Sequence, residues 1–407
     1  MKRKVRFIHC ADLHLDSPFK GYYNLPSSHF EEVKDSTFQA LANIVEHAIT
    51  NEVDFVLMAG DIFDQDGRSL KAQIRFKREL ERLDQRNIDV YIIHGNHDYL
   101  DASYYPVQYP GNVFIFSSEE VQSVPVYKKG EKVANIHGFS YERRSVLQPK
   151  HAEYNKIQDD TYQIGMLHGS LATNTVHDTY APFTVDELLK REMDYWALGH
   201  IHKREMLHQD PPIVYPGNIQ ARHRNEGGAK GCYLVELSQH NASLTFLETD
   251  VIRFRSVQLA LEEGTLQDLE EQVNHVKQEC KSTSTKTLLQ LELSGSLPFH
   301  DKEQVNMLEE LQEIWNEQEE GEPWVHITNM KAHVIPAWNR NKLREGSHFV
   351  AEVLRQLDNR SGIQEDIHDL LYHKQIRKYL SPFSKEEQEE IIQLAEQVLL
   401  PHLLKEE

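Results

Sequence analysis

The chain has 407 residues, a formal net charge of −20 and a hydrophobic fraction of 39%. No stretch approaches the roughly 18 apolar residues that a membrane-spanning helix needs, so we expect a cytoplasmic protein that contacts no membrane. An acidic chain binds nucleic acid poorly through charge alone, and the three scattered cysteines show neither a disulfide framework nor a metal-ligand spacing.

The first 100 residues alternate between strand and helix patterns. Three short apolar runs, at residues 5–8, 55–58 and 90–93, predict buried strands. Between them, residues 30–49 and 70–83 carry apolar side chains at helical spacing. This alternation predicts crossover helices on a mostly parallel sheet.

After residue 99 the sequence changes to short strand patterns separated by proline, glycine and charged residues. We expect a helix over 185–193, a turn over 214–218, and strands over 112–116, 121–127, 132–139, 163–167, 195–198 and 230–237. Together these elements predict an α/β domain over residues 1–250, in which two sheets form a sandwich.

The rest of the chain predicts two further parts. Residues 251–336 alternate strand, helix, strand, helix and strand, which indicates a small α/β domain. Residues 337–407 have a helical pattern throughout, with helices expected over 348–357, 363–379 and 384–404. The last of these has a wide apolar face, which favours packing on neighbouring helices or on a partner chain.

Five short polar segments carry the side chains on which the functional prediction depends. The first three each follow a predicted strand, at the edge where open α/β sheets place their active sites. Their carboxylate, amide and imidazole groups suit divalent cations such as Mn, Fe or Zn. The candidate metal ligands are Asp12, His14, Asp61, Asn96, His168, His200 and His202.

Two cations about 3.5–4 Å apart can hold a phosphate ester and generate a nucleophile between them. Such a pair needs a shared carboxylate, and Asp61, on the middle segment, is the natural bridge. Asp12, His14 and one of the two late histidines would complete one cation position. Asn96, His168 and the other late histidine would complete the second.

Other histidines near these segments have competing interpretations. His137 precedes a glycine as His168 does, and it is the alternative ligand. We prefer His168 because it leads into the segment before His200. His9 and His94 each stand just before a polar segment, and we expect them in the sheet interior or behind the ligands.

Three residues are candidates for catalysis. His97 is not needed as a ligand, so it could donate a proton to the leaving oxygen or stabilise the transition state, and Asp98 could orient it. Asp64 could support the site or cap the start of a helix. Four arginines are candidates for contacts with backbone phosphates, with solvated surface charge as the competing interpretation: Arg143, Arg144, Arg222 and Arg224.

The five segments resemble the calcineurin-like metallophosphoesterase superfamily, whose pattern is Asp-x-His, Gly-Asp-x-x-Asp, Gly-Asn-His-Asp, His and Gly-His-x-His. Residues 7–15 look like the SbcD-type DNA-repair nucleases, and residues 12–19 resemble their bacterial YhaO-type branch. Archaeal and eukaryotic relatives often have histidine where this chain has Asp64, so their handling of DNA ends cannot be transferred.

The resemblance implies a metallophosphoesterase sandwich, two metal ions with Mn²⁺ as the working metal, and DNA phosphodiesters as the substrate. It implies that residues 251–336 form a small α/β capping domain. It also implies that 337–407 form a helical segment that docks on the coiled coil of an SMC-like ATPase, and it leaves a homodimer open.

Two other functions stay open. A phosphodiesterase or phosphatase that acts on a small molecule or a protein would use the same chemistry, although the long extension after residue 250 argues against it. A non-catalytic assembly subunit with a vestigial site is the third interpretation, and the presence of every ligand type argues against that one.

Overall fold

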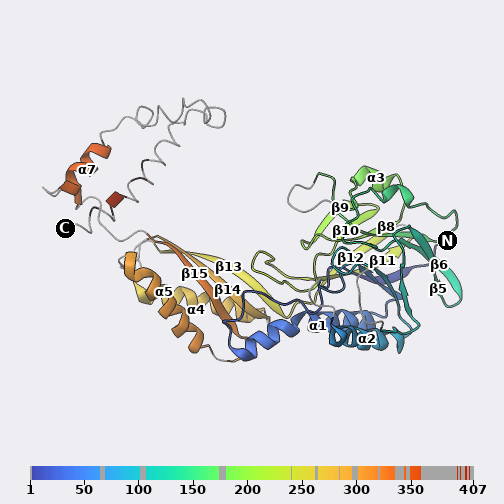
Figure 1. Cartoon of the computed structure of the whole chain (residues 1–407), viewed down its shortest axis with the longest axis horizontal. Helices are drawn as coiled ribbons and strands as arrows, with labels where there is room; N and C mark the ends of the chain where they lie inside the picture. The colour runs from blue at the N-terminus through green and yellow to red at the C-terminus, as the bar shows by residue number, and fades with distance from the viewer. Residues whose placement is uncertain are drawn as a thin grey trace. The chain divides into compact units, whose positions relative to one another are not determined.

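A computed structural model (Figure 1) describes residues 2–64, 69–100, 107–173, 180–239, 241–261, 265–283, 285–295, 301–319, 321–334, 343–344, 349–358, 392, 395, 399, 400 and 403. The chain divides into two compact units. The first comprises 1–256, 280–289 and 321–328, and the second comprises 257–279, 290–320 and 329–407.

The first unit contains two six-stranded sheets. In the first sheet four adjacent strands run parallel to one another, the next strand runs antiparallel to them, and the last strand at that edge runs antiparallel to its neighbour. Its strands, in spatial order, are β12 (Asn241–Glu248), β11 (Gly231–Ser238), β1 (Val5–Cys10), β2 (Phe55–Ala59), β3 (Asp89–Ile93) and β4 (Val113–Ile115).

The second sheet has a central set of four parallel strands and one antiparallel strand at each edge. Its strands, in spatial order, are β5 (Gln122–Lys128), β6 (Glu131–Gly138), β7 (Tyr162–His168), β8 (Tyr195–Gly199), β10 (Pro212–Tyr215) and β9 (Glu205–Gln209). The two-sheet α/β sandwich predicted from the sequence is therefore confirmed.

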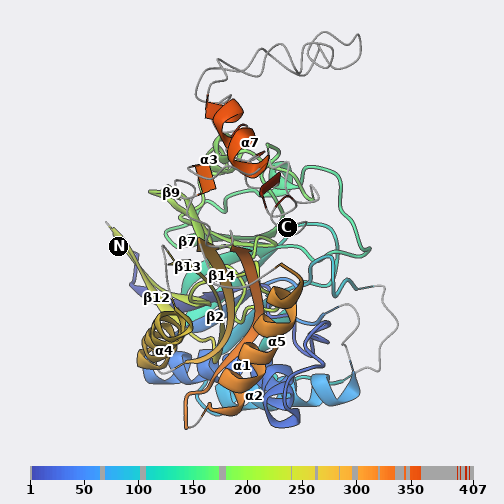
Figure 2. The ribbon, with the colours of Figure 1, turned by 90° about the vertical axis from the view of Figure 1, so that its left-hand side faces the viewer.

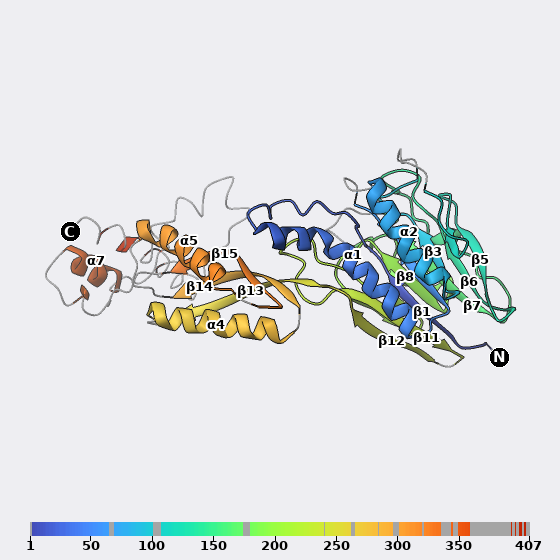
Figure 3. The same ribbon diagram turned by 90° about the horizontal axis from the view of Figure 1, so that it is seen from below.

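Helices α1 (Ser27–Thr50) and α2 (Leu70–Asp84) lie side by side along the outer face of the first sheet (Figure 3). Their buried apolar side chains form one core with that face. The Ser69 hydroxyl accepts a hydrogen bond from the backbone N–H of Ala72 at 3.1 Å, which is an N-cap. Asp64 is thus not the cap of α2, and that alternative was wrong.

A second core fills the space between the two sheets. Phe7 of β1 stacks on Phe55 of β2 with ring centroids 4.9 Å apart, and Tyr195 of β8 meets Phe7 edge-on at 5.3 Å. The outer face of the second sheet packs against loops, the short turn η1 (His151–Glu153) and helix α3 (Val185–Leu189). The two sheets therefore pack face to face, and the second sheet is covered on its outer side.

Some predicted elements of the first unit differ from the structure. Helix α3 ends at Leu189, four residues before its predicted end. Val214 and Tyr215 belong to strand β10, where a turn was predicted. Strands β9 and β12 were not predicted; both are edge strands with largely exposed side chains, so they lack the apolar run that signals a buried strand.

The remaining elements form a three-stranded sheet with helices (Figure 2). They are β13 (Ile252–Leu261), α4 (Leu266–Ser282), β14 (Lys286–Gly295), α5 (Asp301–Glu317), β15 (Val325–Val334) and α7 (Phe349–Asp358). The alternation predicted for 251–336 is present. Of the predicted C-terminal helices, the one over 348–357 is found, whereas 363–379 lies outside the described residues, as does most of 384–404.

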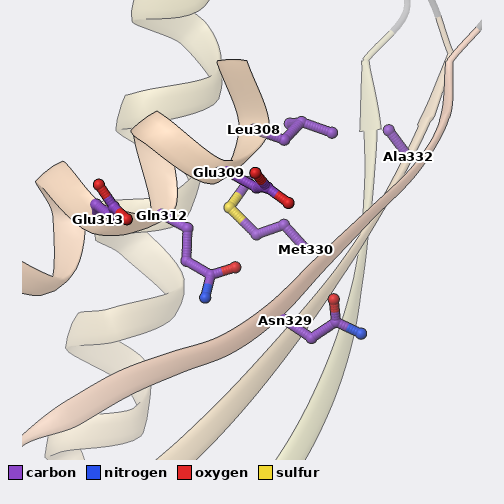
Figure 4. A pocket seen from close by; sticks show the side chains of 7 residues that line it. All are labelled: Leu308, Glu309, Gln312, Glu313, Asn329, Met330 and Ala332. Atoms are coloured by element: carbon purple, nitrogen blue, oxygen red, sulfur yellow. The ribbon is translucent and has the colours of Figure 1, made fainter. Parts of the chain in front are cut away.

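A hollow of about 400 Å³ lies between α5 and β15 in the second unit (Figure 4). Its lining mixes apolar, amide and acidic side chains: Leu308, Glu309, Gln312, Glu313, Asn329, Met330 and Ala332. Within the described ranges, all clusters that could hold a metal ion lie in the first unit, so this hollow does not compete with the predicted site.

No helix in the described part of the chain is both long and apolar enough to cross a bilayer.

Candidate two-metal site

The predicted ligands lie where parallel strands of both sheets end. Asp12 follows β1, Asp61 follows β2, His168 is the last residue of β7, and His200 directly follows β8. The two sheets approach closely at this edge: a Cβ at Gly199 would lie 1.9 Å from the backbone oxygen of Ala59. The fold therefore brings five distant segments of the sequence to one place.

Several ligand residues adopt left-handed backbone conformations that are rare outside glycine. The φ angles are 51° at Asp12, 42° at His14, 51° at Asp61 and 100° at His200. Each such residue costs on the order of 1–3 kcal/mol and persists only where its surroundings hold it. Such a concentration of left-handed residues at one sheet edge is typical of a functional site.

The first group of ligands consists of Asp12, His14 and His202, whose donor atoms all lie within 4.8 Å of one another. The Nε2 atoms of His14 and His202 are 3.0 Å apart. The carboxylate of Asp12 accepts hydrogen bonds from the backbone N–H of His200 at 3.0 and 3.1 Å. That contact orients Asp12 from the opposite sheet.

The second group consists of Asn96, His168 and His200. The amide oxygen of Asn96 lies 3.0 Å from Nε2 of His168 and 3.2 Å from Nδ1 of His200. Nδ1 of His168 donates to the backbone oxygen of Ala59 at 3.0 Å, which turns Nε2 toward the site. His202 and His200 thus lie in different groups, and their assignment as ligands of two different cations stays a prediction.

Asp61 lies between the two groups. Its Oδ2 is 3.8 Å from Nε2 of His14 on one side and 3.5 Å from Nε2 of His168 on the other. Its Oδ1 accepts a hydrogen bond from the backbone N–H of His97 at 2.9 Å. This position matches that of a carboxylate shared by two cations.

The charge states of Asp61 and His14 suit a divalent cation, whereas His168 holds a proton that a cation would have to displace. Burial would raise the pKa of Asp61, but the neighbouring His168 outweighs it and holds that pKa well below its usual value. Burial lowers the pKa of His14, helped by the positive charge of Arg222, so His14 is neutral and keeps a lone pair for a cation. The pKa of His168 is raised to about 9, since the carboxylate of Asp61 outweighs the effect of burial.

Cations would replace protons on such a set, because metal ligands must be deprotonated and the carboxylates then need another positive partner. The donors are carboxylate and amide oxygen and imidazole nitrogen, which Mn, Fe and Zn all accept. The residues present therefore fit a pair of divalent ions.

His97 lies beside the first group. Its ring meets the ring of His14 edge-on at 4.8 Å, its Nδ1 is 4.0 Å from the carboxylate of Asp64, and its side chain is 30% exposed. It is therefore open to a substrate. Asp98 is buried, and its described contacts go to the ring of His94 and to backbone N–H groups. Its expected role in orienting His97 stays a prediction.

The carboxylate of Asp64 belongs to a polar network at the rim of the site. It accepts hydrogen bonds from Ser17 Oγ at 3.1 Å and from Arg222 Nη1 at 2.6 Å. Arg222 thus lies next to the predicted ligands, whereas Arg143, Arg144 and Arg224 are exposed on loops. Of the four arginines predicted to contact phosphate, only Arg222 lies beside the predicted metal ligands.

The structure places three other histidines away from the ligand set. His9 is buried between the sheets, with its ring nitrogens 2.9 Å from Tyr195 Oη and 3.1 Å from the Leu198 oxygen. The ring of His94 contacts Asp98 at 2.9 Å. His137, the alternative ligand, contacts Gln163 at 2.9 Å. None of these three belongs to a potential metal cluster within the described part of the chain.

Sequence reasoning missed Glu226. This residue is 7% exposed, and its Oε1 lies 2.6 Å from Nδ1 of His202. Burial would raise the pKa of Glu226, but its hydrogen bonds with His202 and His223 outweigh that effect and hold the pKa far below its usual value. It belongs to no motif, and the only signal in the sequence is one acidic residue next to a basic run.

Comparison with known families matches residues 5–204 to the calcineurin-like phosphoesterases. The chain is 38% identical over 409 residues to the metallophosphoesterase YhaO of Bacillus subtilis, covering 100% of this chain and 99% of that protein. It is also similar to two DNA double-strand break repair proteins named Mre11. The one from Sulfolobus acidocaldarius is 24% identical, covering 72% of this chain and 76% of that protein. The one from Sulfurisphaera tokodaii is 26% identical, with coverages of 77% and 78%.

Proposed function

The chain belongs to the calcineurin-like phosphoesterase family, and we propose that it is a two-metal DNA nuclease subunit. It would hydrolyse phosphodiester bonds in DNA end processing or repair, together with an SMC-like ATPase. The family supports metal-dependent phosphoesterase activity. The choice of DNA as substrate is supported by the similarity to proteins named for double-strand break repair.

The observation that carries this proposal is the position of Asp61. One carboxylate oxygen lies within 4 Å of a ring nitrogen from each ligand group, at 3.8 Å from His14 and 3.5 Å from His168. Asp12, His14, Asp61 and His202 would hold one cation, and Asp61, Asn96, His168 and His200 the other. When bound, two such cations would polarise the phosphoryl oxygens and activate the attacking water.

The protein's own groups complete the reaction. His97 is partly exposed beside the first group, where its ring can donate a proton to the leaving oxygen. Arg222 places a positive charge at the rim, where it can bind a non-bridging phosphate oxygen. Arg143 and Arg144 lie on the loop that follows β6, which ends at the same sheet edge as β7, and they would contact more distant phosphates.

The working metal and the partners are part of the proposal. Mn²⁺ is proposed, with Fe or Zn as alternatives, because the mixed oxygen and nitrogen donors accept all three. The net charge of −20 opposes binding of DNA through charge alone. A coiled-coil ATPase bound to the C-terminal helices would then supply part of the affinity for DNA.

The test is hydrolysis by the purified full chain in Mn²⁺, with end-labelled duplex DNA and bis(p-nitrophenyl) phosphate as substrates. We expect cleavage of DNA by the wild type, and about a 10²–10⁴-fold loss in His97→Ala. The loss should be much smaller on the nitrophenyl ester, because its leaving group needs no proton. His275→Ala, at an exposed position of α4, is the control and should cleave like wild type.

Other outcomes would favour the alternatives. Hydrolysis of the small ester with no cleavage of DNA, even with the ATPase present, would favour a phosphodiesterase or phosphatase of another substrate. DNA cleavage by the assembled complex that Asp12→Ala leaves unchanged would favour a vestigial site. Equal activity of wild type and His97→Ala on DNA would remove His97 from the mechanism.

A further inference from the structure

We propose that Glu226 is a positioning residue that fixes the ligand His202 and so controls one of the two cation positions without affecting the other. The inference rests on the two-metal site of the proposed function, but it does not depend on which phosphoester is cleaved. Its geometric basis is the 2.6 Å contact between Oε1 of Glu226 and Nδ1 of His202.

The carboxylate of Glu226 is itself held from several sides. Its Oε2 accepts hydrogen bonds from Nδ2 of Asn218 at 2.9 Å and from the backbone N–H of Arg222 at 2.7 Å. Nε2 of His223 lies 3.3 Å from Oε1. Asn218 is fully buried and Glu226 is 7% exposed. A carboxylate restrained in this way can fix the orientation of a neighbouring ring.

The contact decides which nitrogen of His202 faces the site. An ionised carboxylate only accepts hydrogen bonds, so Nδ1 of His202 must be the donor. Nε2 then carries the lone pair, and Nε2 is the atom that lies 3.0 Å from Nε2 of His14. A carboxylate behind a ligating imidazole both sets its tautomer and strengthens it as a ligand.

The second cation position has a different support. There Nδ1 of His168 donates to the backbone oxygen of Ala59 at 3.0 Å, which is a neutral acceptor that no side-chain substitution removes. Each position thus has one histidine whose Nδ1 donates a hydrogen bond away from the site. For His202 the acceptor is the carboxylate of Glu226, and for His168 it is the backbone oxygen of Ala59. The two positions should therefore respond differently to the loss of one carboxylate.

The experiment is a Mn²⁺ titration of the full chain, followed by calorimetry and by electron paramagnetic resonance. Wild type should bind two ions and show a spin-coupled signal at saturation. Glu226→Gln keeps the side-chain shape but replaces the anionic acceptor. We expect one of its two affinities to fall about 10–100-fold and the other to stay unchanged. At concentrations that saturate wild type, the variant should show the spectrum of an isolated ion.

The matched control is Glu236→Gln, the same change in a carboxylate that pairs with Arg6 near the start of β1. It should bind two ions like wild type. Two unchanged affinities in Glu226→Gln would overturn the proposal. Equal weakening of both positions in a folded variant, judged by its thermal unfolding in EDTA, would also overturn it.

A measurement on the wild type keeps the proposal testable if Glu226→Gln does not fold. In protein loaded with diamagnetic Zn²⁺ and labelled with ¹⁵N at histidine, we expect His202 to be protonated at Nδ1. A proton at Nε2 of His202 would contradict the assigned role of Glu226. Neither readout uses a phosphoester, so a failure here is distinct from a failure of the proposed nuclease function.

Discussion

Among the single residues, His9 gives the clearest pH dependence of stability. Burial lowers its pKa to about 3, while its value in an unfolded chain is 6.5. Between these values only the unfolded chain binds the proton, so the free energy of unfolding falls as the pH drops below 6.5. At pH 5 the loss from this residue is about 2 kcal/mol relative to pH 6.5.

Urea unfolding in EDTA at pH 6.5 and pH 5 tests this expectation. His9→Gln can still donate to the Leu198 oxygen and accept from Tyr195, but it does not titrate. Wild type should lose about 2 kcal/mol more than the variant over this interval. Equal losses in the two proteins would show that His9 is not buried in its neutral form.

The site residues that the sequence could predict have short-range signals. Asp12, Asp61 and Asn96 each follow an apolar strand within a few residues, so their convergence follows from the parallel order of the strands. Glu226 has no such signal. It reaches His202 through the fold of a loop that no periodicity predicts, and the Arg222–Asp64 pair joins positions 158 residues apart.

At the level of elements, the two sheets approach each other closely at the end of β8. A Cβ at Gly199 would be 1.9 Å from the Ala59 oxygen and 2.9 Å from Nδ1 of His168. Gly199→Ala must therefore separate β8 from β2 and disturb the bond between His168 and Ala59. We expect a loss of about 1–3 kcal/mol in unfolding free energy and weaker binding of Mn²⁺.

Gly111→Ala is the matched control, since no atom lies within 4 Å of a Cβ placed there. Chemical denaturation and Mn²⁺ titration of both variants give the comparison. If Gly199→Ala matched Gly111→Ala in both measurements, the sheets would not meet at this edge as described.

Most elements with long buried apolar runs were predictable, whereas the exposed edge strands β9 and β12 and the short buried strand β10 were not. Strands β1, β2, β3, β7 and β8 are almost wholly buried, and their apolar runs stand out in the sequence. In the edge strands β9 and β12, apolar and polar side chains alternate only weakly and most side chains are exposed, so their sequences resemble those of loops. Pairing with a neighbouring strand, which the sequence does not display, is what makes them strands.

At the level of the whole molecule, the proposed partner should bind the C-terminal helices. Helix α7 buries Val350, Ala351 and Leu354, while Phe349 beside them is 66% exposed. An aromatic side chain exposed on a helix is a suitable anchor for a coiled coil. Phe349→Glu should weaken binding of the purified ATPase at least about tenfold, measured by biolayer interferometry, and leave ester hydrolysis unchanged.

Leu147→Glu provides the comparison, because Leu147 is 64% exposed in the first unit and far from α7 in the sequence. It should bind the ATPase like wild type. Undiminished binding by Phe349→Glu, or equal loss in both variants, would count against a docking site on α7.

The most direct test of the two-metal site is anomalous diffraction at the manganese edge from crystals of the full chain soaked in Mn²⁺. The account predicts two peaks about 3.5–4 Å apart, one on each side of the Asp61 carboxylate. The first should contact Asp12, His14 and His202, and the second Asn96, His168 and His200. A single peak, or two peaks that do not share Asp61, would contradict it.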